Sequence, residues 1–324
     1  MVEKGTRPTY SFVIPVLNEV AVLEELHSRL SAAASELDGE CEFVFVDDGS
    51  TDGGPALLLE LRARDPRVKL VTLSRNFGHQ VAISAGLDFA GGDAIVTIDA
   101  DLQDPPELVP EMAARWREGF DVVHAVRPVR GGEGRAKQAG RRFFYRLLRR
   151  AADVPLQVDA GDFRLFDRRV ADIVRSMREP NRYLRGLFAW VGYRQTTVTY
   201  ERAARYAGEP KYSWSQLARL GADGLFSFST APLRIILGLG FAIAGLAFLC
   251  AIAAIVLKLA NAYDLPGWAS LVVVFSFFSG VQLILLGTVG MYVGRIHEQG
   301  QRRPLYLLDE VHGFERQPES ARNR

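Results

Sequence analysis

The sequence lacks most features of a secreted or nucleic-acid-binding protein. Its 324 residues include only two cysteines, Cys41 and Cys250, too few for a disulfide framework or a cysteine-based zinc site. The 39 lysines and arginines nearly balance the 38 aspartates and glutamates, so no globally basic nucleic-acid binder is expected. The first ten residues contain no apolar stretch typical of a cleavable signal peptide. We therefore expect the N-terminal domain to stay in the cytosol.

Charge is also missing from two long stretches near the C-terminus. No charged residue occurs in 235–257 or in 265–294, and a helix of about 20 apolar residues is long enough to span a bilayer. The alternative is a pair of buried core helices, which seldom reach this length without a charge. Arginines flank both stretches and a single lysine lies in the connector. The positive-inside rule therefore predicts a multi-pass protein of the cytoplasmic (inner) membrane with both termini in the cytosol.

These patterns predict three regions. Residues 1–230 are expected to form a cytosolic domain, 231–296 two transmembrane helices at about 235–257 and 267–293, and 297–324 a cytosolic tail with a disordered end. Residues 127–150 hold nine lysines and arginines, interleaved with aromatic and leucine side chains toward their C-terminal end. This pattern favours a basic helix on an anionic membrane surface, and 200–230 is assigned to the same surface. A solvated basic face or a nucleic-acid patch is the alternative for 127–150.

The N-terminal region alternates between strand-like and helix-like segments. Short apolar runs predict buried strands at 10–16, 41–46, 68–73, 94–98 and 120–126. Helical stretches separate them at 20–37, 54–64, 79–90 and 106–118. This alternation predicts an α/β fold with a mainly parallel sheet, in which ligands bind at the carboxyl ends of the strands.

Acidic residues follow several of these predicted strands. Asp99, Asp101 and Gln103 come after the fourth strand, and their oxygens suit Mg²⁺ or Mn²⁺. Asp47 and Asp48 follow the second, where a carboxylate accepts hydrogen bonds from a ribose or base. Each motif also has an ordinary explanation, an acidic loop before a helix or a common Asp-Gly-Ser turn. No phosphate-binding P-loop motif is present.

Four segments in this order, SFVIPVLNE, FVDDGSTD, LSRNFGHQ and DADLQDPPE, resemble family-2 glycosyltransferases with a GT-A fold. The later AGDFRLFDRR, the segment ERAARYAGEPKYSW and the two apolar stretches resemble the polyprenyl-phosphate glycosyltransferases within that family. Those enzymes include relatives of dolichyl-phosphate mannose synthase and the GtrB-type bactoprenol glucosyltransferases. The resemblance covers about residues 10–308. The Q-x-x-R-W motif of polymer-making synthases is not found, which counts against such an enzyme.

The resemblance implies roles for particular residues. A nucleotide sugar, most plausibly UDP-linked, would be held by Pro15, Leu17, Glu19, Asp47, Asp48 and Asp99. A divalent metal would be held by Asp101 and Gln103, helped by Asp99, with Asp101 acting in catalysis. Asp162 matches a position often assigned as the catalytic base. An orienting role, toward an arginine or the nucleophile, is the alternative.

The implied acceptor is a polyprenyl phosphate, whose phosphate would attack the anomeric carbon in a single inverting displacement. Because the second pKa of a phosphate monoester is about 6, a strong base is less necessary here than for a hydroxyl acceptor. We expect the phosphate-binding cations among Arg127, Arg135, Arg141, Arg205 and Lys211. Pro210 departs from the family's basic loop, so a backbone hydrogen bond from that position is in doubt.

Three alternatives stay open on the sequence alone. In the first, the acceptor is another lipid or a glycan. In the second, the sugar is mannose, an N-acetylhexosamine or amino-arabinose rather than glucose. In the third, the chain is a non-enzymatic nucleotide-sugar sensor. A Gly290-x-x-x-Gly294 pattern also permits close helix packing and a homo-oligomer.

Overall fold

A computed structural model describes residues 9–126, 160–180, 182–200 and 267–314, together with scattered residues between 237 and 256. The chain divides into two compact units. One is an α/β unit that includes the described residues up to Tyr200 and also 304–314. The other contains α10 (Trp268–Gly300).

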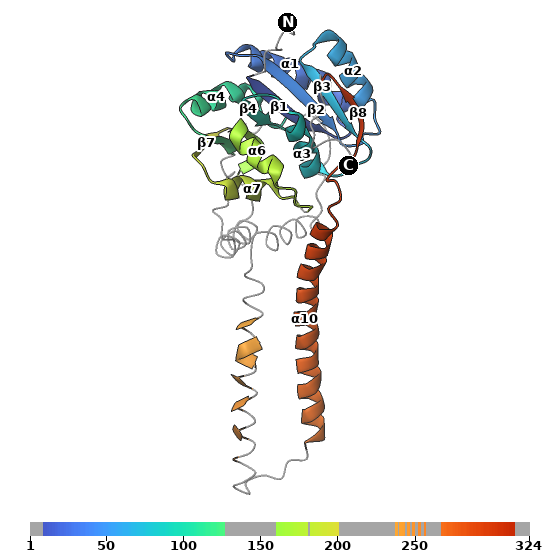
Figure 1. Cartoon of the computed structure of the whole chain (residues 1–324), viewed down its shortest axis with the longest axis vertical. Helices are drawn as coiled ribbons and strands as arrows, with labels where there is room; N and C mark the ends of the chain where they lie inside the picture. The colour runs from blue at the N-terminus through green and yellow to red at the C-terminus, as the bar shows by residue number, and fades with distance from the viewer. Residues whose placement is uncertain are drawn as a thin grey trace. The chain divides into compact units, whose positions relative to one another are not determined.

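The α/β unit is built on one eight-stranded sheet in the order β7-β5-β6-β4-β1-β2-β3-β8. Figure 1 labels its strands β7, β4, β1, β2, β3 and β8. The strands are β1 (Tyr10–Val16), β2 (Cys41–Asp47), β3 (Val68–Leu73), β4 (Ala94–Thr97), β5 (Val122–Val126), β6 (Ala160–Asp167), β7 (Gln195–Thr199) and β8 (Leu308–His312). The first five confirm the strands expected from the apolar runs, with ends shifted by at most two residues. The last three were not expected.

Helices cover both faces of the sheet. They are η1 (Val20–Val22), α1 (Leu23–Ser35), α2 (Gly54–Arg64), α3 (His79–Phe89), η2 (Pro106–Leu108), α4 (Val109–Arg117), α6 (Arg168–Ser176) and α7 (Leu184–Val191). Alternate residues of β1 explain the layers. Phe12 and Ile14 pack on the face of the sheet that α1, α2 and α4 cover, whereas Val13 points to the opposite face, toward α3. A Cβ added to Gly86 of α3 would lie 2.3 Å from a methyl group of Val13.

The central strands run parallel, as the sequence predicts. β1 pairs in parallel with both β2 and β4, and β2 pairs in parallel with β3. The chain order therefore reverses at β1, and such reversals are where open α/β sheets bind ligands. β6 enters antiparallel to both β4 and β5, which makes the sheet mixed rather than wholly parallel.

The sheet is completed by the segment that follows α10 in the chain. β8 pairs antiparallel with β3, and the Tyr306 hydroxyl donates to Asp88 at 2.7 Å. Arg178 binds the two oxygens of Asp88 at 2.8 and 2.9 Å, and Phe314 packs on Phe89 with ring centroids 4.9 Å apart. Residues 304–314 are thus a structural part of the α/β unit. From the sequence these residues were expected to lie in a C-terminal tail, because a short polar strand has no strong local hydrophobic pattern.

One of the two expected spans is described as a continuous helix. Within α10, Phe277–Gly300 has a mean hydropathy of 1.6, and its length and composition suffice to cross a membrane. Of the first expected span only scattered residues between 237 and 256 are described, and these are helical. The two-helix hairpin therefore stays a prediction.

Replacing Glu42 with alanine is expected to lower the free energy of unfolding by about 3 kcal/mol. Glu42 is 3% exposed at the start of β2, and its carboxylate accepts hydrogen bonds from the Ser11 hydroxyl, the Lys69 ammonium and the Gly91 N–H. Thermal unfolding should show a midpoint lower by roughly 6–12 °C. Glu60→Ala, on an exposed part of α2, is the control. Equal melting of the two variants would contradict the prediction.

Candidate active site

The loops that follow β1, β2 and β3 are joined to one another by side chains. The Asn18 backbone N–H donates to the Ser50 hydroxyl at 2.9 Å, and the Thr51 N–H donates to the Asn18 side-chain oxygen at 2.8 Å. Gly49 adopts a φ of +75°, and a Cβ there would lie 2.7 Å from the backbone nitrogen of Asn76. These contacts hold three strand ends together at one edge of the sheet.

The Asp48 carboxylate holds the loops after β2 and β3 together. Its carboxylate accepts the backbone N–H groups of Phe77 and Gly78 at 2.7 and 2.9 Å, and the residue is 2% exposed. Burial raises the pKa of the Asp48 carboxyl. Asp47 is also buried, and it accepts from the Ser50 N–H at 3.2 Å. Asp48 therefore fixes the loop before α3, whatever else it contacts when a ligand is bound.

The other nucleotide-binding candidates lie on the neighbouring strand. Pro15 is buried within β1, whereas Leu17 and Glu19 follow that strand and are partly exposed. Because β1 lies between β4 and β2, the ends of those two strands are about 10 Å apart. The sheet thus brings Asp47 and Asp48 to the same edge as Asp99 and Asp101.

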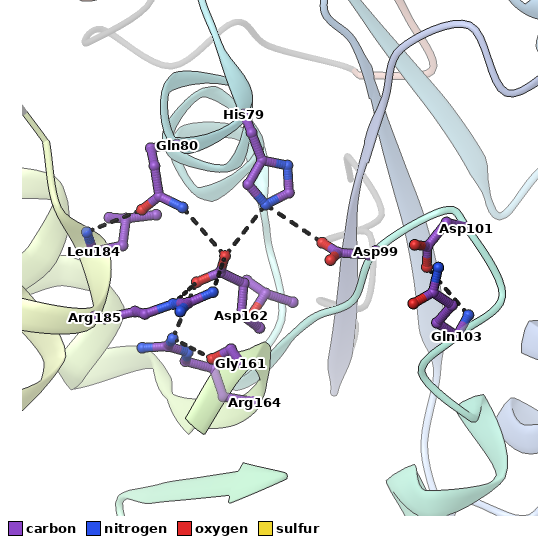
Figure 2. A network of polar contacts seen from close by, with 11 residues as sticks. His79, Gln80, Asp99, Asp101, Gln103, Gly161, Asp162, Arg164, Leu184 and Arg185 are labelled. Carbon is purple, nitrogen blue, oxygen red and sulfur yellow. Dashed lines mark hydrogen bonds and ion pairs between the residues drawn. The ribbon is translucent and has the colours of Figure 1, made fainter. Parts of the chain in front are cut away.

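Asp99, Asp101 and Gln103 lie at alternate positions in the loop that follows β4. The Gln103 backbone N–H donates to the Asp101 carboxylate at 3.1 Å, and the intervening Leu102 adopts a φ of +58° (Figure 2). Asp99 Oδ1 is buried and accepts no hydrogen bond from the described residues. Burial and the nearby carboxylates raise the pKa of Asp99 to about 7, against the opposing charge of His79. Within the described ranges no three His, Cys, Asp or Glu residues are grouped as a metal site.

A network of polar side chains surrounds Asp162 on β6 (Figure 2). Arg185, at the start of α7, donates through Nε and Nη2 to the two carboxylate oxygens at 3.1 and 3.2 Å. Arg164 donates to Oδ1 and the Gln80 amide to Oδ2, both at 3.3 Å. The residue is 8% exposed. Asp162 is therefore a buried acceptor held by cations and amides from three separate elements.

His79 links this network to the acidic loop. Its Nε2 lies 3.4 Å from both Asp99 Oδ1 and Asp162 Oδ2. Although burial opposes the charge, the hydrogen bond to Asp162 and the charge of Asp99 raise the pKa of His79 to about 9. At neutral pH His79 is thus a cation that lies between Asp99 and Asp162.

The cations keep Asp162 ionised. Burial alone would raise its pKa, but Arg185, His79 and Arg164 hold the pKa of Asp162 well below its usual range. Arg164 is buried, which lowers its pKa to about 10, and it stacks 4.5 Å from the ring centroid of Phe188. A carboxylate with so low a pKa is a weak proton acceptor.

Sequence reasoning placed Asp162 but missed the residues that surround it. His79 and Gln80 lie in the LSRNFGHQ segment, which was noted without a role. Arg164 was detectable in principle, because residues i and i+2 of a strand point to the same face. Arg185 had no such signal, since 23 residues separate it from Asp162. Arg127, Arg135, Arg141, Arg205 and Lys211 lie outside the residues that the structure describes.

Comparisons with known proteins match this chain to glycosyltransferases. Residues 11–174 match the model of the family described as glycosyl transferase family 2. The chain is 45% identical over 306 residues to the glycosyltransferase YkcC of Bacillus subtilis, with 94% of this chain and 95% of that protein covered. It is 43% identical to the glycosyltransferase sll0501 of Synechocystis, covering 95% and 97% of the two chains.

A third relative carries a more specific name. The chain is 36% identical over 302 residues to the SfII prophage-derived bactoprenol glucosyl transferase of Shigella flexneri, covering 93% of this chain and 98% of that protein. Among solved structures it is similar to glucosyl-3-phosphoglycerate synthase of Mycobacterium tuberculosis in complex with Mn²⁺, UDP-glucose and phosphoglyceric acid. That similarity has 24% identity and a TM-score of 0.42, over 68% of this chain and 77% of the other.

Proposed function

Because this chain belongs to glycosyl transferase family 2, we propose that it moves a sugar from a nucleoside diphosphate donor to a polyprenyl phosphate. One observation carries the acceptor assignment: 36% identity to a bactoprenol glucosyl transferase extends over 93% of the chain, including the apolar C-terminal part. Glucose, carried by UDP, is the proposed sugar. The alternative is a membrane-tethered transferase that uses a different lipid or glycan acceptor, or a different sugar. The experiment below distinguishes this alternative from the proposed function.

The donor is proposed to lie across the edge formed by β2, β1 and β4. Asp47 and Asp48, with Pro15, Leu17 and Glu19, would hold the base and ribose, and Asp99 and Asp101 would lie near the diphosphate. The separation of about 10 Å between the two acidic pairs supports this, because it lets one molecule contact both. Asp47 is the better candidate for a direct contact, since its two oxygens share the single Ser50 N–H at 3.2 and 3.4 Å, whereas each oxygen of Asp48 binds a backbone N–H of its own at 2.7 or 2.9 Å.

A divalent cation, Mg²⁺ or Mn²⁺, is proposed to be held by Asp99, Asp101 and Gln103. The donors fit, because such ions prefer carboxylate and amide oxygens, and the buried Asp99 Oδ1 makes no hydrogen bond within the described part of the chain, with only the ion pair to His79 at 3.4 Å beside it. When bound, the ion would supply positive charge that stabilises the leaving diphosphate.

The reaction is proposed as a single in-line displacement. A phosphate oxygen of the lipid attacks the anomeric carbon, the bond from that carbon to the β-phosphate oxygen breaks, and the nucleoside diphosphate leaves with the electron pair. The anomeric centre inverts. With a second pKa of about 6, the attacking phosphate is already mostly deprotonated at neutral pH. Arg127, Arg135, Arg141, Arg205 and Lys211 are the proposed cations for this phosphate, because two anions must approach each other.

Asp162 is proposed as a positioning residue rather than a base. Its carboxylate accepts from Arg185, Arg164 and Gln80 and pairs with His79, and its pKa is held low. A nucleophile that carries its own negative charge removes the need for a strong base. Asp162 would then act through the cations that it orients.

The membrane arrangement follows from the acceptor. A polyprenyl tail lies in the bilayer and its phosphate at the surface, so a catalytic domain attached to apolar helices can meet it there. We propose two helices, α10 and one within 235–257, with the catalytic domain and both termini in the cytosol. The apolar length of Phe277–Gly300 supports the first of these helices.

The experiment that tests the function uses the full chain purified in detergent with Mn²⁺ or Mg²⁺ and undecaprenyl phosphate. A panel of labelled nucleotide sugars is offered, and label in the lipid phase is measured with and without a chelator. We expect transfer from one donor, UDP-glucose, that depends on both metal and acceptor. Transfer to a different lipid or glycan acceptor, with none to undecaprenyl phosphate, would replace the proposal by its alternative.

A further inference from the structure

Arg185 is held in a fixed orientation with one end of its guanidinium unused. Its Nε and Nη2 donate to the two oxygens of Asp162, a two-bond geometry that sets the plane of the group (Figure 2). Its Nη1 makes no hydrogen bond with the rest of the described chain. The side chain is 39% exposed. Arg185 therefore has two N–H donors on Nη1 that are oriented by the pairing with Asp162 and belong to a partly exposed side chain.

Arg185 is one of three cations that surround Asp162. Arg164 is 2% exposed beside the same carboxylate, also donates to the Gly161 carbonyl at 2.7 Å, and is covered by Phe188. His79 lies between Asp162 and Asp99. Three cations, Arg164, His79 and Arg185, thus lie around Asp162, and of the two guanidinium groups that of Arg185 is the exposed one. A guanidinium with unused N–H donors is suited to bind a phosphate oxygen.

The backbone of α7 is positioned by the same network. The Gln80 side chain donates to Asp162 through its nitrogen and accepts the Leu184 N–H through its oxygen at 3.0 Å. The residue next to Leu184 is Arg185. The first turn of α7 is therefore held against α3, and the arginine is placed by its backbone as well as by its carboxylate partner.

We propose that Arg185 binds an anionic phosphate oxygen of the substrates through Nη1, and that Asp162 is the residue that positions it. The inference rests on the proposed function, in which two phosphate-bearing molecules meet at this edge of the sheet. The donor diphosphate and the acceptor phosphate share the chemistry that Arg185 recognises. Arg185 adds a cation that the five proposed from the sequence did not include.

The test measures two quantities in the full-length enzyme, the Kd for UDP in the presence of Mn²⁺ and the KM for undecaprenyl phosphate. Arg185→Gln is expected to weaken one of them by about 10- to 100-fold, because a charge-assisted hydrogen bond is lost. Arg185→Lys keeps the charge and should recover part of that loss. Arg115→Gln, an exposed arginine on α4 paired only locally with Glu118, is the matched control.

The positioning role of Asp162 is tested by combining variants. If Asp162 acts by orienting Arg185, Asp162→Asn should weaken the same constant in the wild type but change it less than about threefold in Arg185→Gln. Asp162→Asn is expected to lower the melting temperature under either role, but a purely structural role would show additive effects on binding. Additive effects would overturn the positioning role.

The outcomes separate the two sources of phosphate. A weaker Kd for UDP assigns Arg185 to the donor, and a raised KM for the lipid with unchanged UDP binding assigns it to the acceptor. Unchanged values of both constants would overturn the inference. If the wild type transfers no sugar to undecaprenyl phosphate, the proposed function fails, and UDP binding alone then decides on Arg185: weakened binding supports it, unchanged binding overturns it.

Discussion

Replacing Asp101 with alanine is expected to lower the rate of sugar transfer by about a thousandfold. Asp101 lies with Asp99 and Gln103 after β4, and its carboxylate is the proposed ligand of a divalent cation that stabilises the leaving diphosphate. Loss of that charge stabilisation is worth several kcal/mol, and each 1.4 kcal/mol is tenfold in rate. Transfer of label into the lipid phase measures the rate. The affinity for Mn²⁺ in the presence of UDP, measured by calorimetry, should fall in parallel.

A matched control exists on the same strand. Asp93 precedes β4 at the opposite edge of the sheet, where it is about half exposed and pairs with Arg168 at 3.7 Å. Asp93→Asn should transfer sugar at the wild-type rate. An Asp101→Ala enzyme with more than a tenth of wild-type activity would remove Asp101 from the catalytic machinery. A thousandfold loss with unchanged Mn²⁺ affinity would assign it a role other than metal binding.

Replacing Asp162 with asparagine is expected to cost both activity and stability. The change leaves Arg164 buried without its anionic partner, and breaking such a pair typically costs about 3 kcal/mol or more. It also frees Arg185 and His79, so kcat/KM should fall by about a hundredfold through misplaced cations. Steady-state kinetics and thermal unfolding of the full chain measure the two effects. Catalysis should keep the wild-type pH dependence, since the carboxylate is not proposed to exchange a proton.

Asp121 provides the comparison that separates these effects. It is similarly buried, at the start of β5, and accepts the Arg194 backbone N–H at 3.0 Å as well as a hydrogen bond from Arg169. Asp121→Asn should lose comparable stability while kcat/KM stays within about threefold of the wild type. If Asp162→Asn is stable and nearly inactive, and hydroxide restores its rate at high pH, Asp162 is a base and the positioning role is wrong.

Local sequence patterns were sufficient to predict the strands and helices at the centre of the fold. The runs at 10–16, 41–46, 68–73, 94–98 and 120–126 are apolar without alternation, as expected of strands covered on both faces, and each forms a strand of the sheet. The four helical stretches between them were also predicted, although η1 and η2 open two of them with a 3-10 turn. In both cases the signal lies within one continuous stretch of the sequence.

The remaining strands depend on partners far away in the chain. β8 has the sequence LDEVH, which is too short and too polar to predict a strand alone, and it forms because β3 offers an unpaired edge. β6 pairs with β4 and β5 across a long separation. Pairing of this kind is decided by register and burial in the assembled sheet, and neither is visible in a window of neighbouring residues.

The same division applies to the candidate site. The sequence by itself determined which carboxylates gather at one edge of the sheet, because the ends of parallel strands meet there. Asp47 and Asp48 lie at the end of β2, and Asp99 and Asp101 lie in the loop after β4. Only the tertiary structure shows which donors surround Asp162, since they come from α3, β6 and α7. A carboxylate is a base or an anchor according to the donors around it, and packing between distant segments supplies those donors.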